Sequence, residues 1–177
     1  MGNKKLIDPL GMLISVNTFK QVSLDIYNNY VLKGKHGYLD AMLVNAAFSI
    51  EVGLKYLISY DSGQYSTGHK WIDYWKQLDV KYRNCIIIYL VDRCKNKNYK
   101  TGYIEKSISD LSDTFQNLRY SFEESNVQIE PKFIIELMYA ISFVTECRDS
   151  CKETDKELFE AYTLFQMQKE DYVEIQF

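Results

Sequence analysis

YLDAMLVNAAFSIEVGLKYLISY, residues 38–60, is the stretch of sequence that decides the fold. Its apolar side chains recur every three or four residues, which is the spacing of one face of an α-helix. They form one broad stripe: Leu39, Met42, Leu43, Ala46, Ala47, Ile50, Gly53, Leu54, Leu57 and Ile58. Asp61, Ser62 and Gly63 follow the stripe and favour a turn. The sequence therefore predicts one long helix over residues 38–60.

Helical spacing continues on both sides of this stretch. Asp8 and Pro9 are typical of a helix start, and Gly34 and Gly37 favour the turn that separates the first helix from the second. The predicted helices cover residues 12–30, residues 38–60, a short segment with Trp71 and Trp75, residues 84–91 after a cap at Asp79, residues 103–124, residues 131–152 and residues 158–168.

Residues 84–91 need a separate argument, because the unbroken β-branched run NCIIIYLV also fits a buried strand. The flanking residues 81–83 and 92–95 lack turn-forming types, and no other segment offers a partner strand. We therefore predict a buried helix here. The fold class is all-α: an up-and-down antiparallel bundle of about five to seven helices over residues 1–152. Residues 153–177, with seven acidic and two basic side chains, form an acidic C-terminal helix and tail.

Composition excludes several classes of protein. The chain has 177 residues, 46% of them hydrophobic, and a net charge of −3, which argues against a surface covered in basic charge for nucleic acid. The longest apolar run is residues 85–91, so we expect no membrane span and no membrane partner. The four cysteines form no CxxC pair and histidine occurs twice, so we expect no metal, no cofactor and a reducing, cytoplasmic location. Glycine-rich phosphate loops and the common hydrolase motifs are absent from the sequence.

Four charged residues on two predicted helices could do more than keep the surface soluble. Glu51 and Lys55 lie four residues apart in the favourable acid-then-base order, and Arg119 and Glu123 have the same spacing. Arg119 follows the apolar seam residue Leu118, so its guanidinium needs a carboxylate partner or water. One interpretation is two exposed surface pairs. The other is a polar cleft shared by all four side chains.

His69 and the segment 93–100 each allow two interpretations. The imidazole of His69 either fixes the turn before a short helix or acts as an acid/base group. The segment 93–100 either ends a helix with cations that oppose its dipole or contacts phosphates while Tyr99 or Tyr103 stacks on a base. Its four basic residues are Arg93, Lys95, Lys97 and Lys100.

Three short segments resemble motifs of the HEPN superfamily of small all-α domains. AFSIEVGLKYLI, residues 47–58, is similar to the family's helix with an Ile-Glu-x-x-Leu-Lys core, and GHKWIDYWKQL, residues 68–78, resembles its Gly-His start to the next short helix. FQNLRYSFE, residues 115–123, is similar to the arginine-bearing late helix. The resemblance covers roughly residues 10–152.

The resemblance implies a helical bundle that forms a homodimer, with polar residues of the late helix facing a cleft between subunits. Many HEPN proteins are metal-independent endoribonucleases of toxin–antitoxin and antiviral defence systems, and their motif is an arginine followed four to six residues later by histidine. Arg119 matches the arginine, but Glu123, Glu124 and Ser125 occupy the region where the histidine would be. The usual group that activates a ribose 2′-hydroxyl is therefore missing.

Two functional hypotheses follow, besides a purely structural role for these residues. In the first, the chain is a non-catalytic HEPN-like module that binds a nucleotide, an RNA or a protein partner such as an antitoxin or defence protein, through a cleft of Glu51, Lys55, Arg119 and Tyr120. In the second, it is a metal-independent endoribonuclease with a rearranged site. Its catalytic residues would be Arg119, which stabilises the phosphorane, and Glu123 or His69 as acid/base groups.

Overall fold

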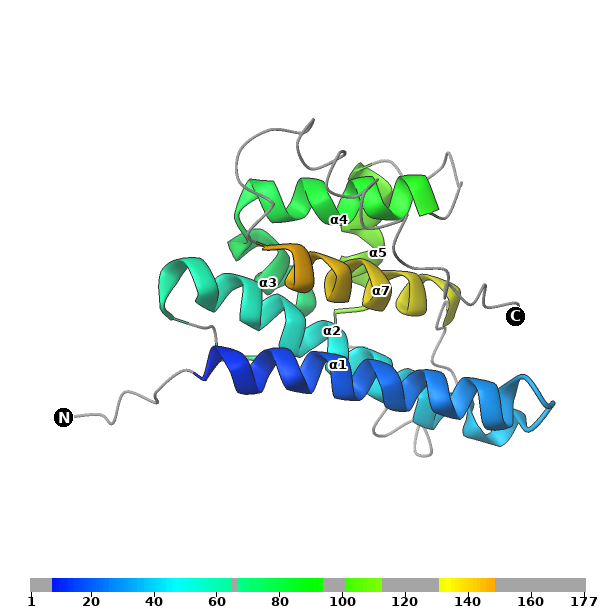
Figure 1. Cartoon of the computed structure of the whole chain (residues 1–177). Helices are drawn as coiled ribbons and strands as arrows, with labels where there is room; N and C mark the ends of the chain where they lie inside the picture. The colour runs from blue at the N-terminus through cyan, green and yellow to red at the C-terminus, as the bar shows by residue number, and fades with distance from the viewer. Residues whose placement is uncertain (1–7, 65–66, 94–100, 113–130, 149–177) are drawn as a thin grey trace.

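Helices make up all the regular structure in the part of the chain that the computed structural model describes, which is residues 8–64, 67–93, 101–112 and 131–148 (Figure 1). The prediction of an all-α fold is confirmed. The elements are α1 (Pro9–Ile26), η1 (Tyr27–Val31, a π-helical turn), η2 (His36–Tyr38, a 3₁₀ turn), α2 (Leu39–Ser62), α3 (Trp71–Gln77), α4 (Val80–Arg93), α5 (Thr101–Asp110) and α7 (Pro131–Cys147).

The ends of α1 and α2 follow the local signals in the sequence. Oδ1 of Asp8 accepts a hydrogen bond from the amide of Gly11 at 2.9 Å, and Pro9 occupies the first turn of α1. Gly34 has a φ of 78° in the turn before α2, and Gly63 has a φ of 65° directly after it. A left-handed glycine is the commonest way to end a helix, so the predicted boundaries of α2 are close to the observed ones.

Helices α1 and α2 form an antiparallel pair held partly by buried serines. Oγ of Ser49 donates to the carbonyl of Val16 at 2.9 Å, and Oγ of Ser23 donates to the carbonyl of Met42 at 2.9 Å. Residue numbers thus fall along α2 as they rise along α1, which is the up-and-down arrangement that we predict. Figure 1 shows α1 at one side of the molecule and α4 at the other, with α2 and α7 between them. Helix α2 packs against α1, α3 and α7.

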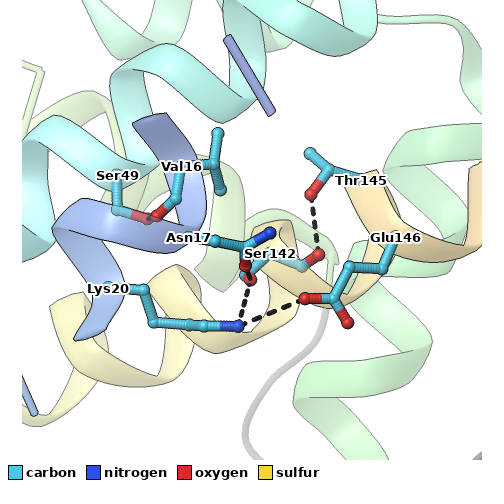
Figure 2. A network of polar contacts seen from close by, with 7 residues as sticks. All are labelled: Val16, Asn17, Lys20, Ser49, Ser142, Thr145 and Glu146. Carbon is cyan, nitrogen blue, oxygen red and sulfur yellow. Dashed lines mark hydrogen bonds and ion pairs between the residues drawn. The ribbon is translucent and has the colours of Figure 1, made fainter. Parts of the chain in front are cut away.

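A polar network joins α1 to α7 (Figure 2). Nζ of Lys20 donates to Oγ of Ser142 at 2.7 Å and forms an ion pair with Oε1 of Glu146 at 3.3 Å. Oγ of Ser142 in turn donates to Oδ1 of Asn17 at 3.4 Å. Ser142 is buried, so this network satisfies polar groups inside the helix interface.

The ambiguous apolar run at residues 84–91 lies inside helix α4. The amide of Lys81 donates to Oδ1 of Asp79 at 2.9 Å, which is the predicted cap. Tyr82, Ile86 and Leu90 are buried at helical spacing and face the core. The prediction of a helix is therefore confirmed, and the run is apolar because α4 buries one side against α7.

Helix α5 ends at Asp110, earlier than the predicted end near residue 124, and residues 111–112 form a turn. The prediction of one unbroken helix is wrong at this point. Oγ of Ser112 donates to the carbonyl of Ile108 at 2.9 Å and accepts from the amide of Ile72 at 3.0 Å. Serine and aspartate side chains compete with the helical ladder for backbone groups, which favours a helix end here. Residues 113–130 and the predicted helix at 158–168 lie outside the described residues.

Among the described residues, one helical stretch, His36–Ser62, is long and apolar enough to cross a membrane by length and composition. It contains α2, and 61% of its most apolar window is buried inside the fold. This burial is typical of a core helix.

Candidate functional site

The carboxylate of Glu51 lies where the loop before α3 meets α2. Its Oε1 accepts a hydrogen bond from Nζ of Lys55 at 2.7 Å and lies 2.9 Å from Nδ1 of His69. An ionised carboxylate can only accept hydrogen bonds, so Nδ1 carries the hydrogen of the second contact. Glu51 and His69 are 18 residues apart in the sequence and come from the two segments that meet here.

Glu51 of this pair is buried and Lys55 is partly buried, which corrects the interpretation of the two as an exposed surface pair. The Glu51 side chain is 7% exposed and the Lys55 side chain 15%. A carboxylate removed from water in this way needs its counterion far more than a surface carboxylate does. The pair therefore belongs to the interior of the fold, although its spacing is that of an ordinary helix-surface pair.

The end of the loop that carries His69 is held by α3. Trp71 and Trp75 of α3 are buried against the core, so the helix is firmly held next to α2. The hydroxyl of Tyr74 donates a hydrogen bond to the carbonyl of Gly68, the residue before His69. Gly68 has a φ of 153°, a conformation that favours glycine. The Gly-His pair thus sits in a backbone shape that other residues rarely adopt.

Lys55 contacts the ring of Tyr74 as well as the carboxylate of Glu51. Its Nζ lies 5.3 Å from the centroid of the ring, which is a cation–π contact. Burial alone would lower the pKa of Lys55, but the hydrogen bond and charge of Glu51 and the contact with Tyr74 outweigh it, so the pKa is raised above 10.5. Burial raises the pKa of Tyr74 above 10.0, and Lys55 offsets part of that rise. At neutral pH Lys55 is a cation and Tyr74 a neutral donor.

These residues are connected by the contacts described above, and we call them the Glu51 cluster: Glu51, Lys55, Gly68, His69 and Tyr74. Both donors converge on Oε1 of Glu51, while Oε2 is buried and has no hydrogen-bond partner among the described residues. A buried acceptor without a partner is costly in a folded protein, and such groups are uncommon. The cluster is therefore an unusually polar arrangement for a site inside the fold.

The cluster combines a held imidazole with access from solvent. The side chain of His69 is 55% exposed, although its Nδ1 is engaged by the buried carboxylate. Histidine changes charge near neutral pH and can donate, accept or transfer a proton. A carboxylate on Nδ1 leaves Nε2 as the ring nitrogen through which such an imidazole meets a ligand. The arrangement can thus bind an anion or exchange a proton with it.

The other candidate residues are not part of the Glu51 cluster: Arg93 is at the end of α4, and the rest lie outside the described residues. Arg119, Tyr120 and Glu123 lie outside the described residues, so the proposed cleft with Glu51 and Lys55 is represented by these two alone. Arg93 is the last residue of α4. The rest of the basic segment, Lys95, Lys97 and Lys100, also lies outside the described residues.

Tyr74 is a member of the cluster that the sequence argument missed. A signal for it was present, since a tyrosine flanked by Trp71 and Trp75 at helical spacing is expected to be buried, and a buried phenol needs a hydrogen-bond partner. Which partner it finds depends on the loop conformation at Gly68. Within residues 8–64, 67–93, 101–112 and 131–148, no group of three or more His, Cys, Asp or Glu side chains is arranged to hold a metal ion.

The chain matches no protein-family model, no curated protein and no solved structure.

Proposed function

We propose that the chain is a HEPN-like helical module that binds a nucleotide, an RNA or a protein partner without cleaving it. A phosphate-bearing ligand, a nucleotide or an RNA, fits the Glu51 cluster best. The observation that carries this choice is the half-exposed imidazole of His69, held through Nδ1 by the buried carboxylate of Glu51. When the ring is protonated, it is a charge-assisted donor to phosphate oxygens.

The two segments that carry the first part of the HEPN resemblance are also the segments that meet in the cluster. Glu51 and Lys55 come from residues 47–58, and Gly68, His69 and Tyr74 come from residues 68–78. The exposed Lys70 follows His69 directly in the sequence. This placement supports a common role for both segments in ligand binding.

Equilibrium binding of a fluorescent single-stranded RNA and of adenosine monophosphate tests this proposal. We expect His69→Gln to weaken binding about tenfold near pH 6, because loss of one charge-assisted hydrogen bond costs about 1.5 kcal/mol. The matched control is His36→Gln, which changes the other, exposed histidine of the chain and should leave binding unchanged. Equal affinities for His69→Gln and the wild type would contradict the proposed site.

A second candidate function is the metal-independent endoribonuclease with a rearranged active site. The contact between Glu51 and His69 favours it, because a carboxylate on Nδ1 is how many enzymes orient a histidine for acid/base work at Nε2. Here His69 would take the proton of a ribose 2′-hydroxyl and Arg119 would stabilise the phosphorane. Incubation of an RNA substrate with the protein in excess chelator, followed by measurement of RNA cleavage, tests this function. Cleavage that disappears in both His69→Gln and Arg119→Ala supports the nuclease, and intact RNA with the wild type rules it out.

The setting of the module is also a proposal. From the resemblance, we propose that the chain works in the cytoplasm as a homodimer, together with an antitoxin or another protein of a toxin–antitoxin or antiviral defence system. Light scattering after size-exclusion chromatography tests the dimer, and a monomer at micromolar concentration would contradict it. The identity of the neighbouring genes tests the proposed toxin–antitoxin or antiviral defence setting.

A further inference from the structure

The loop before α3 is attached to the Glu51 cluster on both sides of one peptide bond. The carbonyl of Gly68 accepts the hydrogen bond from the Tyr74 hydroxyl, and the imidazole of the next residue, His69, contacts Oε1 of Glu51 at 2.9 Å. The carbonyl of Gly68 and the amide of His69 belong to the same rigid peptide plane. A bond that fixes the carbonyl therefore fixes the plane from which the backbone of His69 continues.

Tyr74 is well suited to fix this plane. The residue is 1% exposed, so its ring is locked by packing and its hydroxyl has few alternative partners. Gly68, in contrast, has no side chain to hold its backbone, and its φ of 153° is open to change. The hydroxyl of Tyr74 thus restrains the backbone at Gly68, which glycine itself leaves flexible.

Lys55 connects the two restraints. Its Nζ donates to Oε1 of Glu51 at 2.7 Å and also contacts the side chain of Tyr74. The raised pKa of Tyr74 keeps the phenol protonated at neutral pH, which is the form that donates to the carbonyl of Gly68. Lys55 therefore holds the carboxylate of Glu51 in place, and Tyr74 holds the loop at Gly68.

We propose that Tyr74 is the positioning residue of the Glu51 cluster: by holding the carbonyl of Gly68 it keeps the ring of His69 in the orientation in which Nδ1 donates to Glu51, so that Nε2, in the protonated ring, donates to the phosphate of a bound nucleotide or RNA. In the neutral ring this orientation corresponds to the tautomer with hydrogen on Nδ1. The inference rests on the proposed binding of a phosphate-bearing ligand for its last step. Its central claim, the single tautomer of His69, is independent of any ligand.

Nitrogen-15 NMR of the histidine rings tests that claim, because the protonated and unprotonated ring nitrogens of a neutral imidazole have well-separated shifts. In the wild type above neutral pH, Nδ1 of His69 should have the shift of a protonated nitrogen and Nε2 that of an unprotonated one. In Tyr74→Phe, the two shifts should move toward each other as the tautomers exchange. Two results overturn the proposal: a wild type with the hydrogen on Nε2, or a folded Tyr74→Phe variant with unchanged shifts.

Tyr82→Phe is the matched control. Tyr82 is as buried as Tyr74, and its hydroxyl donates to Oδ1 of Asp61 at 3.1 Å, on the same helix α2. Asp61 lies ten residues beyond Glu51, about 15 Å along the helix axis. The control therefore removes a comparable buried hydroxyl, one that bonds to α2 from α4, without touching the cluster, and the His69 shifts should stay as in the wild type. Equal effects of both variants would reduce Tyr74 to a general stabilising role and overturn the proposal.

A titration with adenosine monophosphate, followed on the His69 signals, tests the last step. We expect the dissociation constant of Tyr74→Phe to be about fivefold higher than that of the wild type, which corresponds to one ordinary hydrogen bond. A wild type that does not bind while Tyr74→Phe still mixes the tautomers would refute the proposed function and leave the positioning role supported. If Tyr74→Phe does not fold, the wild-type tautomer alone still decides, because hydrogen on Nε2 overturns the proposal.

Discussion

Gly53 on α2 and Ile141 on α7 lie in direct contact, with the methyl carbon Cγ2 of Ile141 in the space that a Cβ atom at position 53 would need. Gly53 is therefore a position of close approach between α2 and α7, on a different face of α2 from Glu51. The absence of a side chain here, and not conformational freedom, explains a glycine in the middle of a 24-residue helix.

Gly53→Ala should destabilise the protein although alanine is the better helix former. Propensity would favour alanine by about 1 kcal/mol, whereas overpacking a closed helix interface costs about 1 to 3 kcal/mol. We expect a net loss of up to about 2 kcal/mol in the free energy of unfolding, measured by urea denaturation. Gly102→Ala on α5, where nothing lies within 4 Å of the added carbon, is the control and should be neutral or stabilising.

The double variant Gly53→Ala with Ile141→Ala separates this contact from other effects at position 53. Removing the Ile141 side chain leaves space for the new methyl group, so the cost of Gly53→Ala should shrink or change sign in that background. An unchanged cost would mean that the added methyl group meets something other than Ile141.

Lys55→Met should cost far more stability than Lys132→Met. Both lysines form i,i+4 ion pairs with a glutamate, but the side chain of Lys55 is 15% exposed and that of Lys132 58%, with pair distances of 2.7 Å and 3.9 Å. Loss of Lys55 leaves the buried Glu51 carboxylate without its cation, which should cost about 2 to 4 kcal/mol. The pair of Lys132 and Glu136, whose lysine is exposed and whose charged atoms lie 3.9 Å apart, should contribute less than about 0.5 kcal/mol. Thermal and urea unfolding measure both variants. If Lys55→Met and Lys132→Met lose similar amounts of stability, the Glu51 carboxylate does not depend on Lys55.

The sequence predicted the helices better than it predicted the surroundings of the charged residues. Periodicity and caps located α1, α2, α4 and the start of α7, because these signals act within a few residues. The spacing of Glu51 and Lys55 identified their contact but not its burial, since burial depends on α3 and its loop. The hydrogen bond from Tyr74 to Gly68 and the helix end at Ser112 depend on tertiary contacts, which no local pattern encodes.

Ser142→Ala should weaken the attachment of α7 to α1 (Figure 2). The buried hydroxyl accepts from Nζ of Lys20 at 2.7 Å and donates to Oδ1 of Asn17 at 3.4 Å. Its removal leaves two largely buried polar groups with fewer partners, so we expect a loss of about 1 to 2 kcal/mol in the free energy of unfolding. The control is Thr18→Ala, an exposed hydroxyl on α1 that bonds within its own helix and should change stability by less than about 0.5 kcal/mol. Equal effects would mean that the network contributes nothing to stability.

Stability should fall at alkaline pH, and the Glu51 cluster should account for part of the fall. The pKa of Lys55 is raised above 10.5 in the folded state, since its contacts with Glu51 outweigh its burial, and burial raises the pKa of Tyr74 above 10.0. A raised pKa means that the folded state holds the proton more tightly than the unfolded state does. This contribution is complete below about pH 10 and is lost as the pH rises through the folded-state values.

Urea unfolding at a series of pH values between about 8 and 12 measures this loss, with the slope set by the difference in bound protons. Tyr74→Phe removes one of the two groups and perturbs the other, so its free energy of unfolding should decline less steeply above about pH 10 than that of the wild type. Lys132→Met, which removes an exposed lysine, should keep the wild-type slope. Parallel curves for the wild type and Tyr74→Phe would show that other tyrosines and lysines cause the alkaline loss. In that case the phenol and the cation of the cluster would hold their protons no more tightly in the folded chain than in the unfolded one.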